Sequence, residues 1–301
     1  MSKDYIIAGF RIRIEGRYCN LHDLGLRGFR PFEAEEEPDA DYVMRLDPEC
    51  ELGPAPAVFE LIHSFEFPDA RHNCTLKRAE NAWIFGMRPY GYDKDDRDTL
   101  FVMPFGSREV RSNIASGKKP DPSLLRFGLW LMFGLAINPL GAIAVHSSVI
   151  VKNKRAVMFL GESGTGKSTH TRLWRENIVN STLLNDDSPI VRCVEGVPYV
   201  FGSAWSGKTP CYVNRGFPIR AIVRLSQAPH NKIRKLSVLE ALAALLPSCP
   251  PAFSLDSDLQ DNIFAAIAEI LKSVPVYHLE CLPDAEAARL AHRTLYVEPQ
   301  R

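Results

Sequence analysis

Hydrophobic and polar residues alternate through the first 120 positions, in short runs that Gly or Pro interrupts. Alternation with a period of two is typical of half-buried strands, and these runs are rich in β-branched and aromatic residues. The pattern therefore predicts a β-rich, antiparallel N-terminal domain over residues 1–120. The clearest predicted strands are YIIAGFRIRI (5–14), DYVMRL (41–46), NAWIFGM (81–87) and TLFVMPF (99–105).

Longer elements follow from residue 121, after a segment rich in Ser, Gly, Pro and Lys that is typical of a link between domains, SGKKPDPS (116–123). Strands are expected over 142–151 and 155–160. The few residues between them cannot hold a crossover helix, so the two strands must pair as an antiparallel hairpin. Other expected elements are helices over 123–136, 167–177, 237–246, 256–273 and 283–295, a hairpin over 190–201 and a strand over 276–280.

One apolar stretch raises the question of a membrane. Residues 127–145 contain no ionisable side chain over nineteen positions, which is close to the length of a bilayer span. Asn138-Pro139 and Gly141 divide the stretch into a helical and an extended part, which favours a buried helix and strand. A membrane span is the alternative that the length leaves open. The N-terminus alternates apolar with charged residues, unlike a signal peptide.

The composition is that of an ordinary globular protein, with 46% hydrophobic and 24% charged residues in a chain of 301. Thirty-six Lys and Arg balance thirty-six Asp and Glu, so we expect neither nucleic acid nor an anionic membrane as a partner. The seven cysteines are widely spaced and form no CxxC motif, which argues against a disulfide framework and a zinc site. A cytoplasmic location is expected.

The sequence GESGTGKST (161–169) satisfies the pattern GxxxxGK[ST] between an apolar strand and a helix, and we call it the phosphate loop. Glycines let backbone N–H groups surround phosphate oxygens, and the following helix adds the positive end of its dipole. Lys167 would reach the β- and γ-phosphates, and the Ser168 hydroxyl would ligate Mg²⁺. The residues expected to bind the nucleotide are Gly161, Glu162, Ser163, Gly164, Thr165, Gly166, Lys167, Ser168 and Thr169.

The next apolar run, TLLNDD, ends in Asp186 and Asp187. Two adjacent carboxylates can divide two tasks, since one can hold Mg²⁺ and the other can accept a proton from an attacking hydroxyl. An ordinary Asp-Asp turn before Ser188-Pro189 is the alternative. A single acidic residue usually serves an NTP hydrolase, so the pair favours a phosphotransferase.

His146 ends the apolar run AIAV, fifteen residues before Gly161, and a lone histidine in a strand is usually structural. The loop GSAWSGKTP (202–210) combines small residues with Trp205 and Lys208. Lys208 could clamp a phosphate or a substrate carboxylate, and the alternative is an exposed loop lysine without a ligand. Arg215 is a weaker cationic candidate. Trp205, Lys208 and Arg215 are the candidate substrate contacts.

His146, the phosphate loop and the aspartate pair together resemble the catalytic domain of HPr kinase/phosphorylase, within the group related to phosphoenolpyruvate carboxykinase. The resemblance implies an α/β fold with a mixed sheet, ATP and Mg²⁺ as cofactors, and sometimes a homo-oligomer. It also implies that His146 and Asp186 lie at the reaction centre, with Asp186 as the base, and that Asp187 and Ser168 serve the metal.

The chain resembles a divergent member of this family. Thr169 stands where bacterial HPr kinases usually carry an acidic residue, and GSAWSGK stands where their downstream signature lies. The N-terminal half does not resemble their regulatory domain. HPr is therefore not the expected substrate, and the N-terminal domain is a candidate for binding a substrate or partner.

The sequence predicts a Mg²⁺-dependent kinase that transfers the γ-phosphoryl group of ATP to a hydroxyl on a small molecule, peptide or protein. The phosphate loop does not recognise the nucleobase, so GTP is an alternative to ATP as the phosphoryl donor. The alternatives are a nucleotide-sensing regulatory module without transfer activity, and a plain ATPase.

Overall fold

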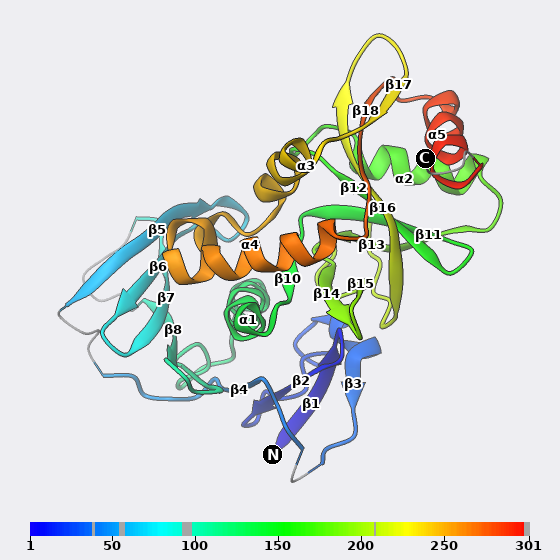
Figure 1. Ribbon diagram of the computed structural model, residues 1–301. Helices are drawn as coiled ribbons and strands as arrows, with labels where there is room; N and C mark the ends of the chain where they lie inside the picture. Colours follow the sequence, from blue (N-terminus) through cyan, green and yellow to red (C-terminus); the bar gives the residue numbers. More distant parts are fainter. Residues whose placement is uncertain (38–39, 54–57, 92–97, 208, 298–301) are drawn as a thin grey trace. The chain divides into compact units, whose positions relative to one another are not determined.

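The computed structural model describes residues 1–37, 40–53, 58–91, 98–207 and 209–297. The chain folds into two compact units, of which the first is Met1–Leu140 with Leu255–Leu259 and the second is Gly141–Ser254 with Gln260–Arg301 (Figure 1). The division after Leu140 lies twenty residues beyond the expected boundary at residue 120. The difference is helix α1 (Pro122–Ile137), which belongs to the first unit.

The first unit contains one nine-stranded sheet. In sheet order its strands are β3 (Glu33–Ala34), β1 (Ser2–Ile7), β2 (Phe10–Glu15), β4 (Met44–Asp47), β9 (Glu109–Ser112), β8 (Thr99–Pro104), β7 (Ala82–Pro89), β6 (His72–Ala79) and β5 (Phe59–Phe67). The expected β-rich fold is confirmed, but the expectation of a purely antiparallel sheet is wrong, because β4 runs parallel to both β2 and β9. Short 3₁₀ helices lie at Arg27–Phe32 and Pro68–Ala70.

The segment 5–14, expected to be one strand, is a hairpin. The chain reverses at Ala8 and Gly9, whose φ angles are +55° and +81°. Positive φ at both central residues is the geometry of the tight hairpin turn that matches strand twist. The alternating pattern continues across the turn, so periodicity alone did not reveal it.

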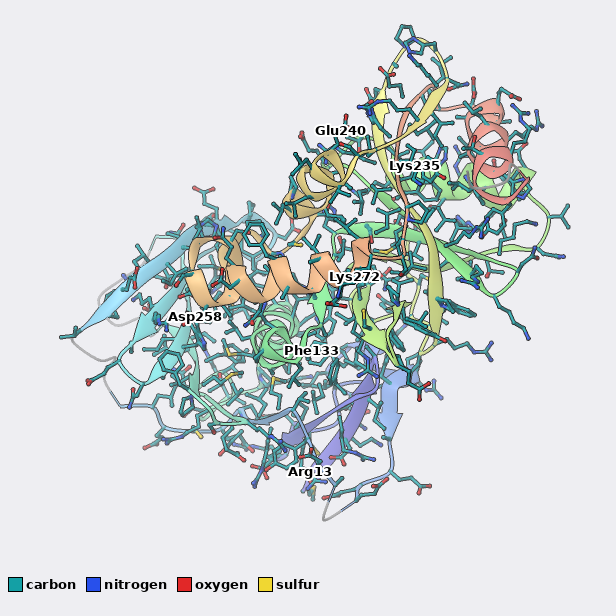
Figure 2. All side chains as sticks on the ribbon, in the orientation of Figure 1. Arg13, Phe133, Lys235, Glu240, Asp258 and Lys272 are labelled. Carbon is teal, nitrogen blue, oxygen red and sulfur yellow. The ribbon has the colours of Figure 1, made fainter. Side chains whose placement is uncertain are left out.

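Helix α1 lies where the sequence predicts a helix over 123–136. The Asp121 side chain accepts hydrogen bonds from the N–H groups of Ser123 and Leu124 and so caps the helix. Ten of its sixteen residues are buried, among them Phe133 (Figure 2). The stretch Pro122–Leu140 has the length and hydropathy of a membrane span, and 61% of its most apolar window is buried inside the protein, as in a core helix.

Close packing within the first unit explains why α1 belongs to it. The helix contacts β4, β7 and β8, and Gly128 lies against the ring of the fully buried Phe101. A Cβ atom at Gly128 would lie 2.3 Å from Phe101 Cζ, so no side chain fits there without displacing the ring.

We expect Gly128→Ala to destabilise the protein, although alanine is the better helix former. The propensity gain is about 1 kcal/mol, whereas overpacking a close-packed core costs about 1–3 kcal/mol. Urea unfolding measures the difference. Phe101→Leu should restore part of the loss in the double variant, and a Gly128→Ala protein more stable than the wild type would contradict this packing.

The second unit contains a mixed sheet, so the predicted α/β class is confirmed. In order its strands are β10 (Ile143–Ala144), β14 (Ile190–Val194), β15 (Val197–Phe201), β16 (Gly216–Gln227), β12 (Arg155–Leu160), β11 (Ser147–Lys152) and β13 (Ser181–Asp187). Strand β16 pairs with β15 through residues 216–218 and in parallel with β18 (Val276–Cys281) through residues 222–227. Strand β18 also pairs with β17 (Lys232–Lys235). Strand β16 is not predicted from the sequence pattern, although it is the longest strand of the sheet.

The two hairpins predicted in this unit are confirmed. Strands β11 and β12 pair antiparallel across Asn153 and Lys154, which both have positive φ, and β14 pairs with β15. The strand expected over 142–151 is divided into β10 and β11 around Val145 and His146, because the two parts pair with different strands.

The predicted helices are also present, as α2 (Lys167–Asn177), α3 (Val238–Leu245), α4 (Ser257–Leu271) and α5 (Ala285–His292). Ser237 and Glu240 form a capping box at the start of α3, and Asp284 caps α5. Helix α4 begins in the part of the chain that belongs to the first unit and continues in the second. Shorter 3₁₀ or π-helical segments are Asn138–Leu140, Leu246–Ser248, Pro251–Leu255 and Arg293–Val297.

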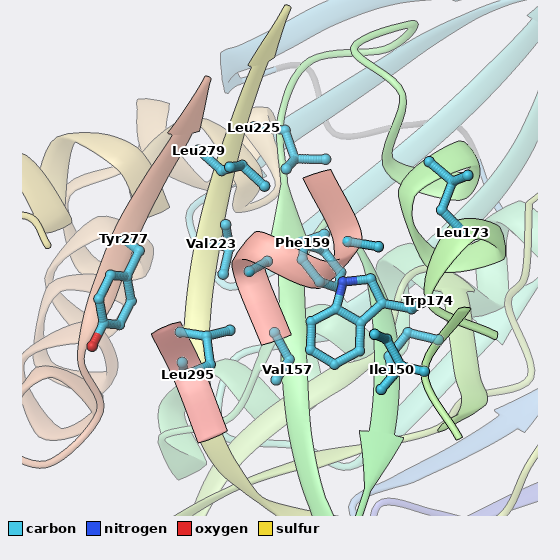
Figure 3. Close-up of a cluster of buried hydrophobic side chains, with 14 residues drawn as sticks. Ile150, Val157, Phe159, Leu173, Trp174, Val223, Leu225, Tyr277, Leu279 and Leu295 are labelled. Atoms are coloured by element: carbon cyan, nitrogen blue, oxygen red, sulfur yellow. The ribbon is translucent and has the colours of Figure 1, made fainter. Parts of the chain in front are cut away.

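A hydrophobic cluster holds α2 and α5 against one face of the second sheet (Figure 3). Phe159 of β12 and Trp174 of α2 lie in it with ring centroids 5.7 Å apart. His170, the residue beside them on α2, is 2% exposed, and its Nε2 accepts a hydrogen bond from Trp174 Nε1 at 3.2 Å. Because β12 leads into the phosphate loop and α2 follows it, this cluster fixes both ends of that loop.

Burial lowers the pKa of His170 to about 4. The unfolded chain binds a proton at this residue below its ordinary pKa of about 6.5, whereas the folded protein does so only near pH 4. The stabilisation is therefore complete above pH 6.5 and is lost as the pH falls towards 4, by up to about 1.4 kcal/mol per pH unit.

We expect His170→Gln, which keeps a hydrogen-bond acceptor, to make the free energy of unfolding less dependent on pH between 6.5 and 4. Urea unfolding at several pH values tests this. The exposed His230→Gln should behave like the wild type, and an unchanged pH dependence in His170→Gln would rule out the assignment.

Candidate functional site

The phosphate loop lies between β12 and α2 and has the backbone that its glycines allow. Gly161 has a φ of +154°, and a Cβ atom there would lie 2.4 Å from Thr165 Oγ1. Gly166 precedes α2 with a φ of +103°, and no described side chain caps the helix. The first N–H groups of α2 are therefore open to an anion, as at the phosphate-binding ends of other helices.

Three neighbouring strands bring the predicted residues to one edge of the sheet. Strand β11 runs antiparallel between β12 and β13, so its first residue lies beside their last residues. Ser147 is paired with Leu160 on one side and with Asp187 on the other. His146, directly before β11, thus lies between the start of the phosphate loop and the aspartate pair.

Asp186 is the buried member of that pair. The residue is 5% exposed, and Ser168 Oγ donates a hydrogen bond to Asp186 Oδ1 at 2.9 Å. The other oxygen, Asp186 Oδ2, is buried without a hydrogen-bond partner among the described residues. A buried carboxylate oxygen without a partner is costly, and a bound cation would offset that cost.

These oxygens fit Mg²⁺. This ion prefers oxygen ligands, keeps several waters, and commonly takes one or two protein carboxylates together with substrate phosphates. Within the described residues, no group of three or more His, Cys, Asp and Glu side chains could hold a metal by itself. The arrangement of Ser168 and Asp186 therefore suits an ion that arrives with a nucleotide.

Asp187 and His146 form the accessible part of the site. His146 Nε2 lies 3.8 Å from Asp187 Oδ1, and the two side chains are 45% and 41% exposed. Burial and the nearby Lys167 charge lower the pKa of His146, although both aspartates act in the opposite direction. His146 is consequently neutral at pH 7, when it can donate one hydrogen bond and accept another.

Lys167 is tied to the loop that precedes it. Its Nζ donates hydrogen bonds to the carbonyl oxygens of Gly161 and Glu162, at 2.7 and 3.1 Å. Burial lowers the pKa of the Lys167 ammonium, while Asp187 and Asp186 raise it. The ammonium thus lies at the mouth of the loop, where a phosphate could replace its carbonyl partners.

A cavity of about 330 Å³ connects these groups. It brings together most of the residues that the sequence predicts for phosphate binding and catalysis. The lining residues are His146, Ser163, Gly164, Gly166, Lys167, Ser168, Thr169, Asp186, Asp187 and Gly207.

This site lies inside a region shared with a known family. Residues 129–284, more than half of the chain, match the family described as "SynChlorMet cassette protein ScmC". The chain belongs to the ScmC family. Every residue that lines the cavity of this ScmC-family protein falls within the matched region.

Other comparisons add little. No curated protein matches the chain. A solved structure, "Structure of the Hpr(Ser) kinase/phosphatase from Coxiella burnetii", is similar with a TM-score of 0.30 and 14% identity, over 50% of this chain and 87% of that one. A likeness of this size carries no conclusion about the function of the ScmC-family protein.

Of the three candidate substrate contacts, the two that the structure describes, Trp205 and Arg215, are not among the lining residues. Trp205 is 2% exposed, and its backbone oxygen accepts a hydrogen bond from Asn185 Nδ2. It therefore stabilises the segment 202–207 from within. Arg215 is exposed and is not among the described lining residues. Lys208 lies outside the described residues.

Asn185 and Gly207, which no sequence motif indicates, hold residues 202–207 against the aspartates. The Asn185 side chain also contacts Ser203 Oγ at 3.3 Å. The Gly207 N–H donates to Asp186 O at 2.6 Å, and a Cβ atom at Gly207 would lie 2.8 Å from that oxygen. The small residues of GSAWSG were a sign of this close approach, but only the folded chain shows which strand they approach.

Proposed function

We propose that this ScmC-family protein is a Mg²⁺-dependent phosphotransferase that moves the γ-phosphoryl group of a nucleoside triphosphate to a hydroxyl acceptor. The observation that carries the proposal is the single cavity shared by the phosphate loop, Lys167, His146 and the aspartate pair. Positioning and charge stabilisation supply most of the catalysis of phosphoryl transfer, and these are the groups that provide both.

Ser168 and Asp186 are the proposed metal ligands. The sequence resemblance assigned the metal to Ser168 and Asp187, but the hydrogen bond joins Ser168 to Asp186, and Asp186 Oδ2 is buried without a hydrogen-bond partner in the part of the chain that the structure describes. Bound there, Mg²⁺ would neutralise charge on the β- and γ-phosphate oxygens. Lys167, which lines the same cavity, would hold these phosphates through its ammonium group.

Asp187 is the proposed base, in place of Asp186. Its carboxylate is the more exposed of the two and can meet an acceptor, since the Asp187 side chain is 41% exposed and Asp186 only 5%. The acceptor hydroxyl would give its proton to Asp187 as its oxygen bonds to the γ-phosphorus, and the bond from that phosphorus to the bridging oxygen of the nucleoside diphosphate would break. Neutral His146, 3.8 Å from Asp187, would orient the carboxylate or the acceptor.

The first test concerns nucleotide binding. We expect Lys167→Ala to weaken binding of Mg-ATP at least about tenfold, because charge-assisted bonds to phosphate are lost. Isothermal titration calorimetry measures the affinity. Lys235→Ala, which removes an exposed lysine of β17, is the matched control and should bind as the wild type does. Equal affinity in Lys167→Ala and Lys235→Ala would contradict nucleotide binding at this loop.

The second test separates the two aspartates by isosteric changes. We expect Asp187→Asn to reduce transfer of label from γ-labelled ATP at least about 100-fold, the usual contribution of a general base, with the Mg²⁺ requirement unchanged. Asp186→Asn should instead raise the Mg²⁺ concentration needed for half-maximal binding of ATP. The reverse pattern would restore the assignment based on the sequence resemblance.

The label experiment, carried out in cell lysate divided by size, also separates the alternative functions. Label in the small-molecule or polypeptide fraction, present with the wild type and absent with Asp187→Asn, supports a kinase and identifies the class of acceptor. Release of phosphate without an acceptor indicates an ATPase, and binding without turnover a nucleotide-sensing module. A role of the N-terminal unit in binding the acceptor or a partner stays a prediction.

A further inference from the structure

A second and larger cavity lies on the other side of the phosphate loop. Its volume is about 530 Å³, which is within the usual range for pockets that bind small molecules. It shares Gly164, Gly166 and Thr169 with the cavity that holds the aspartates. The two cavities are therefore neighbours, with the loop and the first turn of α2 between them.

The walls of this larger cavity are mostly apolar. Leu173 of α2, Leu225 at the end of β16, and Leu282 after β18 supply aliphatic surface. The described lining residues include no Asp, Glu, Lys or Arg, and His170 is 2% exposed with its Nε2 accepting the hydrogen bond from Trp174. Such a lining suits an uncharged, largely apolar group and does not suit a second phosphate.

The passage between the cavities is open. Apart from its neighbours in the chain, no described residue has an atom within 4 Å of a Cβ atom built on Gly164 or Gly166, so both glycines face open space. Gln227 Nε2 donates a hydrogen bond to Gly164 O at 3.2 Å and so connects the end of β16 to the loop. A ligand with an anionic end and an uncharged end could therefore span both cavities over these glycines.

We propose that the larger cavity binds the nucleoside of the triphosphate whose phosphates lie on the loop. This inference rests on the proposed function. It also fixes the direction of the bound nucleotide, since the nucleobase would lie against α2 and β16 and the γ-phosphate would point towards His146 and Asp187. The acceptor would then approach from the side of Gly207, away from the nucleoside.

The test compares ATP with inorganic tripolyphosphate, which has phosphates and no nucleoside. In the full-length protein with Mg²⁺, we expect ATP to bind at least about tenfold more tightly, because only ATP gains contact with the apolar walls. Equal affinities would overturn the nucleoside site and leave phosphate binding at the loop intact. Binding of neither ligand would overturn both the inference and the proposed function.

A filling substitution adds an independent measurement. Ala228→Trp places a large ring in the cavity from the end of β16, and should weaken ATP at least about tenfold while tripolyphosphate changes by less than about twofold. Leu239→Trp, on the exposed surface of α3, is the control and should affect neither ligand. An Ala228→Trp protein that folds and binds ATP normally would overturn the assignment. Should that variant fail to fold, Leu282→Ala, at the more exposed rim, should still weaken ATP and spare tripolyphosphate, and an unchanged ATP affinity would overturn it.

Discussion

The antiparallel pairing of β11 between β12 and β13 is the constraint on which the site depends. If β11 ran parallel to its neighbours, its first residue would lie at the far edge of the sheet, a full strand length from the phosphate loop. The reversed direction instead brings His146 beside the loop and beside Asp187. Register matters as much as direction, because a shift of one residue would turn each side chain to the opposite face.

The same register gives the two aspartates different surroundings. Successive residues of a strand point to opposite faces, so Asp186 and Asp187 separate although they are neighbours in sequence. Asp186 faces Ser168 and is buried, while Asp187 is open and lies near His146. A repeated residue in the sequence thus becomes two chemically distinct groups, which is the basis for assigning one to the metal and the other to the acceptor.

Burial on both sides of the phosphate loop lowers the pKa values of the histidines and the lysine near its ends. The cluster around Phe159 and Trp174 excludes water behind the loop and keeps His170 neutral. Partial burial in front of it lowers the pKa of His146 and of Lys167. Electrostatic interactions are stronger where water is excluded, so a charge at this edge would act more strongly on a phosphate bound there than a charge on an open surface would.

Much of the second unit follows from the sequence alone. The phosphate loop, helices α2 to α5 and the hairpin β11–β12 are where local patterns predict them, because turns, caps and helical periodicity involve residues close in the chain. The sequence also predicted His146, Lys167, Ser168 and both aspartates as site residues, and the structure brings them to one cavity. What it did not give was strand β16, the parallel placement of β4, the membership of α1 in the first unit, and the different environments of Asp186 and Asp187. These depend on which distant segments pair and pack together, and only the tertiary structure decides such contacts.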